Sequence, residues 1–305
     1  MKPKSSTSMF IPLFIAIVAV SFSSIFVKWS DAPASIQGMY RLLFTVILML
    51  PFGRKHVNQI PYISKQNWIL LILSGFFLAL HFLLWMGSLK YTTVASSTMI
   101  LALEPVFVMI GSFILYKEKT ALSSLLGMFI AIGGVAFIAW GDIGVSTTQL
   151  YGDILSVLGT AAVAFHMLAG QKVLSQVSSY LYSIIVFTCA VVVFAVYNAV
   201  MGISFTNYEA SDWGIFTLLA VVPTVFGHLL FNWLMQYISA TTVSMSILGE
   251  PVGASILAWI LLGERLSTLQ TIGGVFTLFG LILFMRTKQH IHEPPVTSPS
   301  IQQAG

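Results

Sequence analysis

The sequence predicts an all-α integral membrane protein, with ten transmembrane helices arranged as two inverted five-helix repeats. Three observations predict this fold class. First, 57% of the 305 residues are hydrophobic and only 8% are charged, with a mean hydropathy of +0.92, whereas about 25% of the residues of a soluble domain are charged. Second, the chain contains ten apolar runs of membrane-spanning length. Third, its second half repeats the pattern of its first half.

The ten apolar runs are each close to the 20 or so residues that cross the hydrocarbon core as a helix. The first run follows two lysines, as in a signal peptide, but it is longer than the apolar region of such a peptide and no cleavage pattern follows it. We therefore expect it to remain as a span. The runs cover residues 9–28, 35–52, 68–89, 92–116, 121–140, 151–171, 179–201, 212–237, 240–262 and 268–285.

The positive charges between the runs predict the orientation of the chain. With the N-terminus in the cytoplasm, ten Lys and Arg residues fall in cytoplasmic segments and three fall on the opposite side. Because cytoplasmic loops carry the excess of Lys and Arg, we expect a multi-pass protein of the cytoplasmic membrane with both termini inside the cell. Residues 1–8 form the predicted N-terminal tail, and the polar, Pro-rich segment 286–305 is predicted to be disordered.

The two halves of the chain align without a gap when the sequence is shifted by 146 residues. The shift superposes Glu104-Pro105-Val106 on Glu250-Pro251-Val252, and it also superposes two glycine pairs and a second pair of glutamates. Only ten acidic residues exist in the chain, so chance does not explain this coincidence. We predict two related halves, 9–140 and 151–285. Each half has five spans, an odd number, so the second half enters the bilayer from the opposite side.

The segments that follow the two Glu-Pro motifs carry a family resemblance. LYKEKTALSSLLGMFIAIGGVAFI at 115–138 and LGERLSTLQTIGGVFTLFGLILF at 262–284 resemble the two EamA domains of the drug/metabolite transporter superfamily. The resemblance spans almost all of the apolar chain. It implies a ten-helix carrier that exports amino acids, other small metabolites or drugs from the cytoplasm.

Glu104 and Glu250 are the leading candidates for the transport site. A charged group at the bilayer centre costs about 2.5–3.5 kcal/mol on insertion scales, so it usually faces a cavity or a partner. Pro105 and Pro251 remove a backbone donor and disfavour helix at the preceding residue, so each span is predicted to break there. In one interpretation the glutamates only cap the second half-helix. In the other they bind substrate or carry a proton, and proton coupling remains a hypothesis.

Arg41 is a third charged residue inside a predicted span. A guanidinium there could hold a substrate carboxylate in a bidentate fork. The 146-residue shift places Arg41 opposite Phe187, so this charge breaks the symmetry of the halves, as recognition of a polar substrate would require. The alternative is that Arg41 pairs with Glu104 or extends to the membrane interface.

Five further residues in the predicted spans complete the set of translocation-path candidates. His81 and Trp85 are four residues apart and would share one helix face, where an imidazole and an indole could bind a cationic or aromatic substrate. The alternative for each histidine is a neutral ring bonded to a backbone carbonyl. The five residues are His81, Trp85, His166, His228 and Asn232.

These features favour a secondary transporter that moves small metabolites by alternating access. The resemblance implies that it exports amino acids or related compounds. A multidrug or cationic-compound exporter is the alternative, and an intramembrane enzyme using Glu104 and Glu250 is the alternative of another class. No GxxxxGK[ST] phosphate-binding motif is present, so ATP is not expected as the energy source. We expect no cofactor, no metal and no nucleic-acid partner. The expected partners are a small-molecule substrate, the lipid bilayer and protons as candidate coupling ion, in a monomer or a homodimer.

Overall fold

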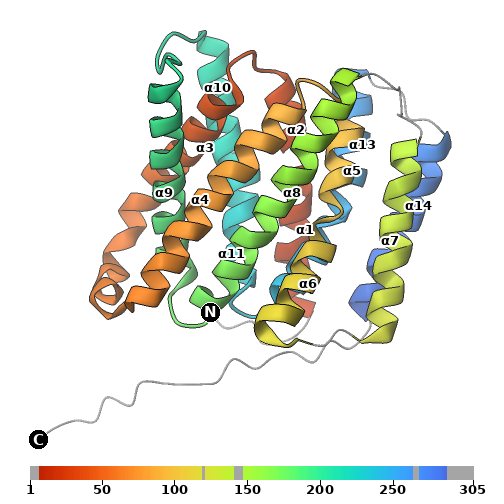
Figure 1. Ribbon diagram of the computed structural model, residues 1–305, viewed down its shortest axis with the longest axis horizontal. Coiled ribbons are helices and arrows are strands. Elements are labelled where there is room, and N and C mark those ends of the chain that lie inside the picture. The colour runs from red at the N-terminus through yellow and green to blue at the C-terminus, as the bar shows by residue number, and fades with distance from the viewer. Residues whose placement is uncertain (1–6, 119–120, 141–146, 264–267, 287–305) are drawn as a thin grey trace, which may run out of the picture.

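The computed structural model describes residues 7–118, 121–140, 147–263 and 268–286, and these ranges contain helices and no strands. The helices lie side by side in one bundle (Figure 1). The first half contains α1 (Thr7–Ser21), α2 (Ser23–Lys28), α3 (Ala34–Met49), η1 (Leu50–Lys55), η2 (Val57–Tyr62), α4 (Lys65–Ser88), α5 (Val94–Leu101), α6 (Glu104–Tyr116) and α7 (Leu122–Trp140). The second half contains α8 (Thr147–Leu174), α9 (Ser179–Val200), α10 (Ala210–Leu219), η3 (Ala220–Leu229), α11 (Leu230–Leu234), α12 (Ala240–Ile247), α13 (Gly249–Leu262) and α14 (Thr268–Arg286).

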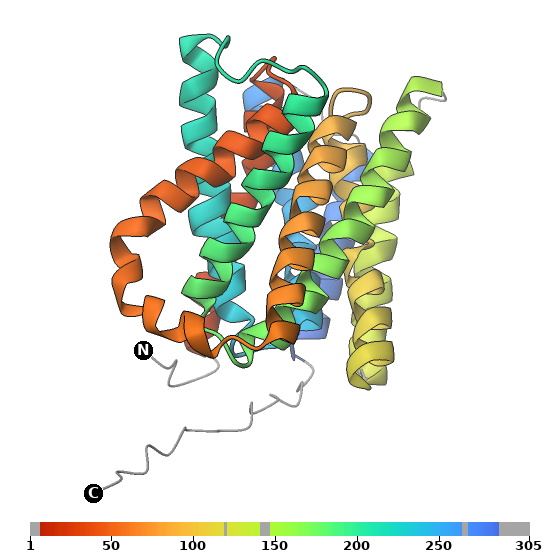
Figure 2. The same ribbon diagram turned by 60° about the vertical axis from the view of Figure 1, so that its left-hand side comes forward.

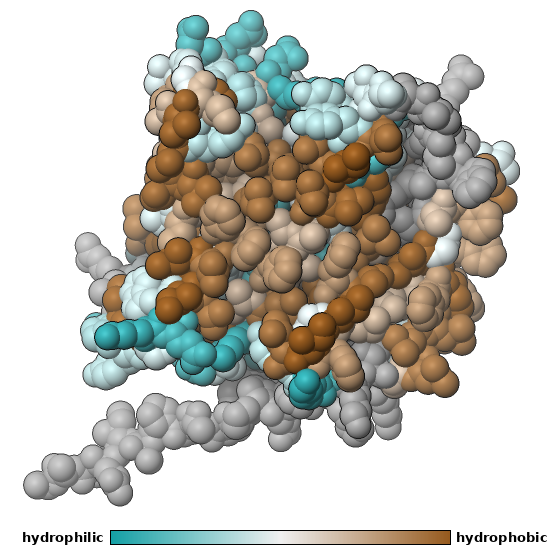
Figure 3. Space-filling view, viewed as in Figure 1, coloured by the Kyte–Doolittle hydropathy of each residue, from teal (hydrophilic) through white to brown (hydrophobic). Residues whose placement is uncertain are grey.

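Seven helical segments of the described chain are long and apolar enough to cross a membrane. Three shorter apolar helices accompany them, at Glu104–Tyr116, Ser124–Gly134 and Thr271–Phe284. The face shown in Figure 3 carries a broad apolar band, with hydrophilic residues gathered above and below it. A band of this kind is the surface that a bundle presents to lipid, because lipid tails solvate apolar side chains. The chain is therefore a multi-pass membrane protein.

The helices follow the predicted apolar runs, with differences at the ends and in the interior. The first helix begins at Thr7 rather than at residue 9, and the last helix includes Arg286, which the sequence places in the predicted tail. The remainder of both predicted tails, 1–6 and 287–305, lies outside the described residues. Between α3 and α4, η1 and η2 curve away from the bundle (Figure 2).

Four of the predicted runs are interrupted inside the bundle. The run 92–116 breaks between α5 and α6, and the run 240–262 breaks at Leu248, as the Glu-Pro motifs predict. The break between α1 and α2 falls at Phe22. The run 212–237 contains a π-helical segment, η3, with Pro223 inside it. The last two interruptions were not predicted from the sequence. The π-helical segment is of interest because π-helical turns occur frequently at functional sites.

The two segments interrupted at Glu-Pro lie against each other in opposite directions. The first part of one segment, α5, packs against the last part of the other, α13, and α6 packs against α12. Because the first part of each segment contacts the last part of the other, the two segments are antiparallel. This arrangement brings the two interruptions to the same depth of the bundle, so the glutamates that follow them face a common space.

The helices α7 and α14 form a close pair at one edge of the bundle (Figure 1). Glycines let the two backbones touch: a Cβ on Gly127 would lie 2.7 Å from the backbone nitrogen of Phe284, and one on Gly134 would lie 2.5 Å from that of Thr277. Close approach at small residues is a common way for helices to associate in lipid, where van der Waals packing replaces the hydrophobic effect.

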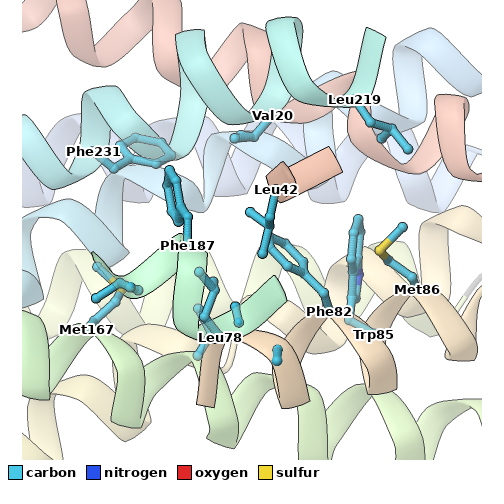
Figure 4. Close-up of a cluster of buried hydrophobic side chains, with 14 of the residues drawn as sticks. Val20, Leu42, Leu78, Phe82, Trp85, Met86, Met167, Phe187, Leu219 and Phe231 are labelled. Carbon is cyan, nitrogen blue, oxygen red and sulfur yellow. The ribbon is translucent and has the colours of Figure 1, made fainter. Parts of the chain in front are cut away.

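An apolar core lies between α3, α4, α9 and the segment from α10 to α11. Leu42, Leu78, Phe187 and Leu219 are fully buried or nearly so in this core. Phe82 and Trp85 project into it from α4 (Figure 4). The core fixes the position of α4, and α4 carries three of the residues that line the cavity described next.

Candidate functional site

A small cavity lies where the two interrupted segments break, and both halves of the chain contribute to it. Its walls come from α1, α2, α4, α5 and α6 of the first half and from α8, η3 and α11–α13 of the second. Seven of the eight candidate residues from the sequence line this one cavity. They are His81, Trp85, Glu104, His166, His228, Asn232 and Glu250.

The two glutamates lie at the start of the second half of each interrupted segment. Glu104 is the first residue of α6, and Glu250 is the second residue of α13. Their side chains are 3% and 7% exposed. The N-cap residue of each helix is a leucine, Leu103 or Leu248, and its side chain makes no capping hydrogen bond. The Oε1 atom of Glu104 is buried and has no hydrogen-bond partner there.

Arg41 lies behind the cavity wall and not in it. Its Nε donates to Thr224 Oγ1 at 2.7 Å, and its Nη1 donates to Ser23 Oγ at 3.0 Å. The guanidinium carbon lies 4.2 Å from the centre of the Phe82 ring, a cation–π contact. The Nη2 atom is buried without a partner in the described residues. Arg41 is 0% exposed, so the interpretation that it extends to the membrane interface is wrong.

The side-chain hydrogen bonds that Arg41 makes among the described residues go to Thr224 and Ser23, and neither cavity glutamate is one of its partners. The alternative pairing with Glu104, which the sequence left open, has no hydrogen bond in the described structure. Arg41 therefore lies next to the cavity, because Ser23 and Phe82, which contact its guanidinium, both line it.

Two of the three cavity histidines are bonded to backbone carbonyls, as one interpretation of the sequence expected. Nδ1 of His81 donates to the Gly159 carbonyl at 2.9 Å. Nδ1 of His166 lies 3.1 Å from the Ser74 carbonyl and 2.8 Å from Ser74 Oγ. Since a carbonyl only accepts, the His81 bond places the proton on Nδ1 and leaves Nε2 as an acceptor in the neutral ring.

Aromatic contacts hold the remaining polar rings in place. His81 and Trp85 stack with centroids 5.9 Å apart and planes 8° from parallel, as their spacing on one helix face predicts. His228 packs edge-on against Phe82 at 5.2 Å. The Nε1 donor of Trp85 is buried without a partner in the described chain. The cavity thus combines aromatic walls with unused donors and acceptors.

Several residues that line the cavity were not predicted, although the internal repeat relates three of them to predicted residues. A shift by 146 residues converts His228 into Phe82, Trp85 into Phe231, and His166 into Val20. All three of these counterparts line the cavity. No comparable signal marks Ser23, because serine occurs in many apolar helices without a functional role.

The cavity is too small for a metabolite in this conformation. Its volume is about 40 Å³, and a water molecule needs roughly 10–15 Å³ by the same measure. It therefore has room for a few waters, and a larger ligand would require the helices around it to separate. The described residues contain no group of three or more His, Cys, Asp or Glu side chains placed to hold a metal ion.

Comparison with known proteins identifies the family. The model of the EamA-like transporter family matches residues 7–140 and again residues 150–286. The chain belongs to the EamA-like transporter family. The resemblance to EamA domains that the sequence motifs suggested is confirmed, and so is the prediction of a membrane transporter.

Curated relatives and a solved structure agree with this membership. The uncharacterized transporter YyaM of Bacillus subtilis is 25% identical over 80% of each chain. The riboflavin transporter ImpX of Fusobacterium nucleatum is 23% identical over 79% of this chain and 84% of its own. One crystal structure superposes with a TM-score of 0.74 over 92% of this chain and 98% of that protein, at 13% identity. At such low identity the superposition shows a shared fold alone.

Proposed function

We propose that this EamA-family protein is a secondary transporter that exports small metabolites, amino acids or related compounds, across the cytoplasmic membrane by alternating access. The observation that carries the proposal is the cavity at the two helix breaks. Glu104 and Glu250, which are both buried, line this one cavity inside an apolar bundle. Broken helices that place polar groups at such a depth are the usual substrate sites of secondary transporters.

We also propose ten spans in two inverted repeats, 9–140 and 151–285, with both termini in the cytoplasm. Positions related by the 146-residue shift support the repeats, because they line the cavity in pairs. The pairs are Val20 with His166, Phe82 with His228, Trp85 with Phe231, Leu101 with Ile247, and Glu104 with Glu250. A site on the symmetry axis between two inverted halves would have this composition.

Helix packing supports the same arrangement. The first helix of the first half, α1, packs against η3 in the third span of the second half, and the corresponding helices α8 and α4 pack against each other. The contacts of α5 with α13 and of α6 with α12 are related in the same way, because each joins equivalent parts of the two halves. If the two halves exchange their conformations, a cavity open to one side becomes a cavity open to the other.

Hydrogen bonds near the two ends of α8 support a closed intermediate between those states. Near its start, Asp153 accepts from Thr92 at 3.1 Å and from Ser96 at 3.2 Å. Near its end, Gln171 donates to Glu118 at 2.6 Å, and its Oε1 accepts from the Ala240 nitrogen at 2.8 Å. Asp153 and Gln171 are about 27 Å apart along a helix. We expect transport to open one of these two contacts at a time.

The substrate class is a proposal that rests on the cavity walls. An unused donor on Trp85 and an unused acceptor on Glu104 suit a small molecule that both donates and accepts hydrogen bonds, such as an amino acid. The aromatic rings and two carboxyl groups favour the alternative, a cationic drug, since cations bind aromatic faces. The relative with a riboflavin transporter's name adds riboflavin to the compounds that should be tested.

The experiment is a flux assay in proteoliposomes. The purified protein is offered amino acids, nucleosides, riboflavin and cationic drugs, each with and without a pH gradient. We expect the wild type to move one class, and Glu104→Gln or Glu250→Gln to abolish its movement or its response to the gradient. Glu209→Gln, the same chemical change at an exposed loop residue, serves as the matched control and should transport normally.

Two results would contradict the proposal. If the wild type moves none of these compounds while it converts one of them chemically, the intramembrane enzyme using Glu104 and Glu250 replaces the transporter. If both cavity variants transport as fast as Glu209→Gln and only unfold at lower temperature, the Glu-Pro motifs are structural. The site would then have to be sought at Arg41, His81 and Trp85.

A further inference from the structure

A buried hydrogen-bond network centred on Ser74 joins three helices. Ser74 Oγ on α4 lies 2.8 Å from His166 Nδ1 on α8 and 2.6 Å from the hydroxyl of Tyr182 on α9. Ser74 and Tyr182 are 0% exposed and His166 is 3% exposed. Because a buried polar group that loses its partner is costly, this network opposes any movement that separates the three helices. We call α4, α8 and α9 the Ser74 unit.

A second buried network, centred on Arg41, joins three other segments. Arg41 on α3 donates to Thr224 on η3 at 2.7 Å and to Ser23 on α2 at 3.0 Å. Thr45, one turn further along α3, donates to the Ala220 carbonyl of η3 at 3.3 Å. Arg41, Thr45 and Thr224 are all 0% exposed, so the same argument applies to them. We call the spans formed by α1–α2, by α3 and by α10–η3–α11 the Arg41 unit.

The two units are equivalent under the internal repeat, and each takes helices from both halves of the chain. A shift by 146 residues carries α1–α2 onto α8, α3 onto α9, and α4 onto the span from α10 to α11. The shift does not carry one network onto the other, because Arg41 corresponds to Phe187 and Ser74 corresponds to Ala220. The two equivalent units are therefore held together by different residues.

Close contacts at glycines hold each unit together as well. A Cβ on Gly75 of α4 would lie 2.8 Å from the Val186 carbonyl oxygen of α9, and one on Gly159 of α8 would lie 3.1 Å from the Trp85 nitrogen of α4. In the Arg41 unit, a Cβ on Gly227 of η3 would lie 2.6 Å from a side-chain carbon of α1. Helices that approach this closely have few side chains between them that could repack. Each unit should therefore move as a rigid body.

The boundary between the two units is mainly apolar. Along it α3 packs against α9, and the buried side chains of Leu42, Phe82 and Phe187 fill the space between the units (Figure 4). A hydrogen bond from Asn232 Nδ2 to Ser183 Oγ at 3.0 Å crosses the boundary. Since apolar contacts are non-directional, packed helices can slide on them at low cost. The boundary is therefore where the bundle can shear.

The candidate transport cavity lies on this same boundary. Each unit contributes six of the lining residues, and the two interrupted segments contribute four. Separation of the units at one end of the bundle would therefore open the cavity to that end. We propose, building on the proposed transport function, that the bodies that rock against each other during transport are the Arg41 unit and the Ser74 unit, and not the two sequence repeats. Arg41 and Ser74 act as positioning residues that keep each unit rigid.

Distances between pairs of spin labels, measured by pulsed electron paramagnetic resonance, distinguish moving units from moving repeats. The labels are attached to cysteine substitutions of four exposed residues at one end of the bundle, in a Cys189→Ala background. Trp29 and Ser211 belong to the Arg41 unit, whereas Tyr91 and Met201 lie at the ends of α4 and α9 in the Ser74 unit. The Trp29/Ser211 and Tyr91/Met201 pairs each join the two repeats within one unit. The Trp29/Tyr91 and Met201/Ser211 pairs each join the two units within one repeat.

Each pair is compared between Asp153→Leu and Gln171→Leu, which remove hydrogen bonds near opposite ends of α8. We expect the mean distance of the two pairs that join the units to differ between these variants, and that of the two pairs within a unit to stay the same. The reverse pattern, which moving repeats would produce, overturns the proposal, and so does a shift in all four pairs or in none.

The parent protein provides a second measurement if either variant fails to fold. A mixture of states broadens the distance distribution of a pair only when its two members move relative to each other. The two pairs that join the units should therefore have broader distributions than the two pairs within a unit, and equal or reversed widths overturn the proposal. These spectra need no substrate, so the moving bodies can be refuted while the flux assay still supports transport, and the reverse.

Discussion

The contact between α7 and α14 makes the sharpest prediction about stability, through the substitution Gly134→Ala. The new Cβ would lie 2.5 Å from the backbone nitrogen of Thr277 and 2.6 Å from the carbonyl oxygen of Gly273. Real Cβ contacts are essentially never shorter than 3.0 Å, and the opposing atoms are backbone, which cannot rotate away. The helices would have to separate, and overpacking of this kind typically lowers the free energy of unfolding by about 1–3 kcal/mol.

The adjacent glycine provides a matched control. A Cβ on Gly133 would have no neighbour within 4 Å, and alanine is a better helix former than glycine by roughly 0.8–1 kcal/mol. Thermal unfolding of the two variants in the same detergent should therefore diverge, with Gly134→Ala less stable than the wild type and Gly133→Ala equal to it or more stable. Equal unfolding temperatures for the two variants would refute the backbone contact between α7 and α14.

Three further substitutions test other parts of the structure. Lys117→Gly should raise stability by roughly 0.5–1 kcal/mol in thermal unfolding, because Lys117 ends α6 with a φ of 57° that favours glycine; a loss of stability would contradict this. Thr224→Val removes the acceptor for Arg41 Nε and should lower stability by about 1.5–3 kcal/mol, while the exposed control Thr217→Val should change it little. Gln171→Leu breaks two hydrogen bonds that join α8 to the end of α6 and the start of α12. Each of these hydrogen bonds contributes about 1 kcal/mol. Their loss should therefore speed the labelling of a cavity cysteine by a thiol reagent that enters from that end of the bundle. An unchanged labelling rate would contradict a role of Gln171 in closing this end.

The sequence predicted those parts of the fold that depend on composition and on proline. Apolar runs located the helices because lipid requires long apolar segments, and Glu-Pro located two breaks because proline removes a backbone donor. The π-helical segment η3 and the break at Phe22 were missed. Pro223 lies inside η3 and is compatible with either a kink or a wider turn. The choice between them depends on tertiary contacts, such as the hydrogen bond from Thr45 Oγ1 to the Ala220 carbonyl at 3.3 Å.

The candidate site was largely predictable for a physical reason. Ionisable and polar side chains are costly in lipid, so they gather where the bundle offers a cavity, and seven of eight such residues do so here. Arg41 was the exception: its long side chain reaches Thr224 and Ser23 instead of the cavity.

The most direct test of alternating access at this cavity measures which side of the membrane can reach it. Met167 lines the cavity, so a cysteine at this position, in a Cys189→Ala background, is treated in oriented vesicles with a membrane-impermeant thiol reagent from one face and then from the other. A cysteine at Tyr62, which is 88% exposed in η2, is the control and should react from one face alone.

The proposed mechanism predicts that the cysteine at position 167 reacts from either face and that a transported substrate slows both reactions. Reaction from a single face, or no reaction from either face, would contradict a cavity that opens alternately to the two sides of the membrane.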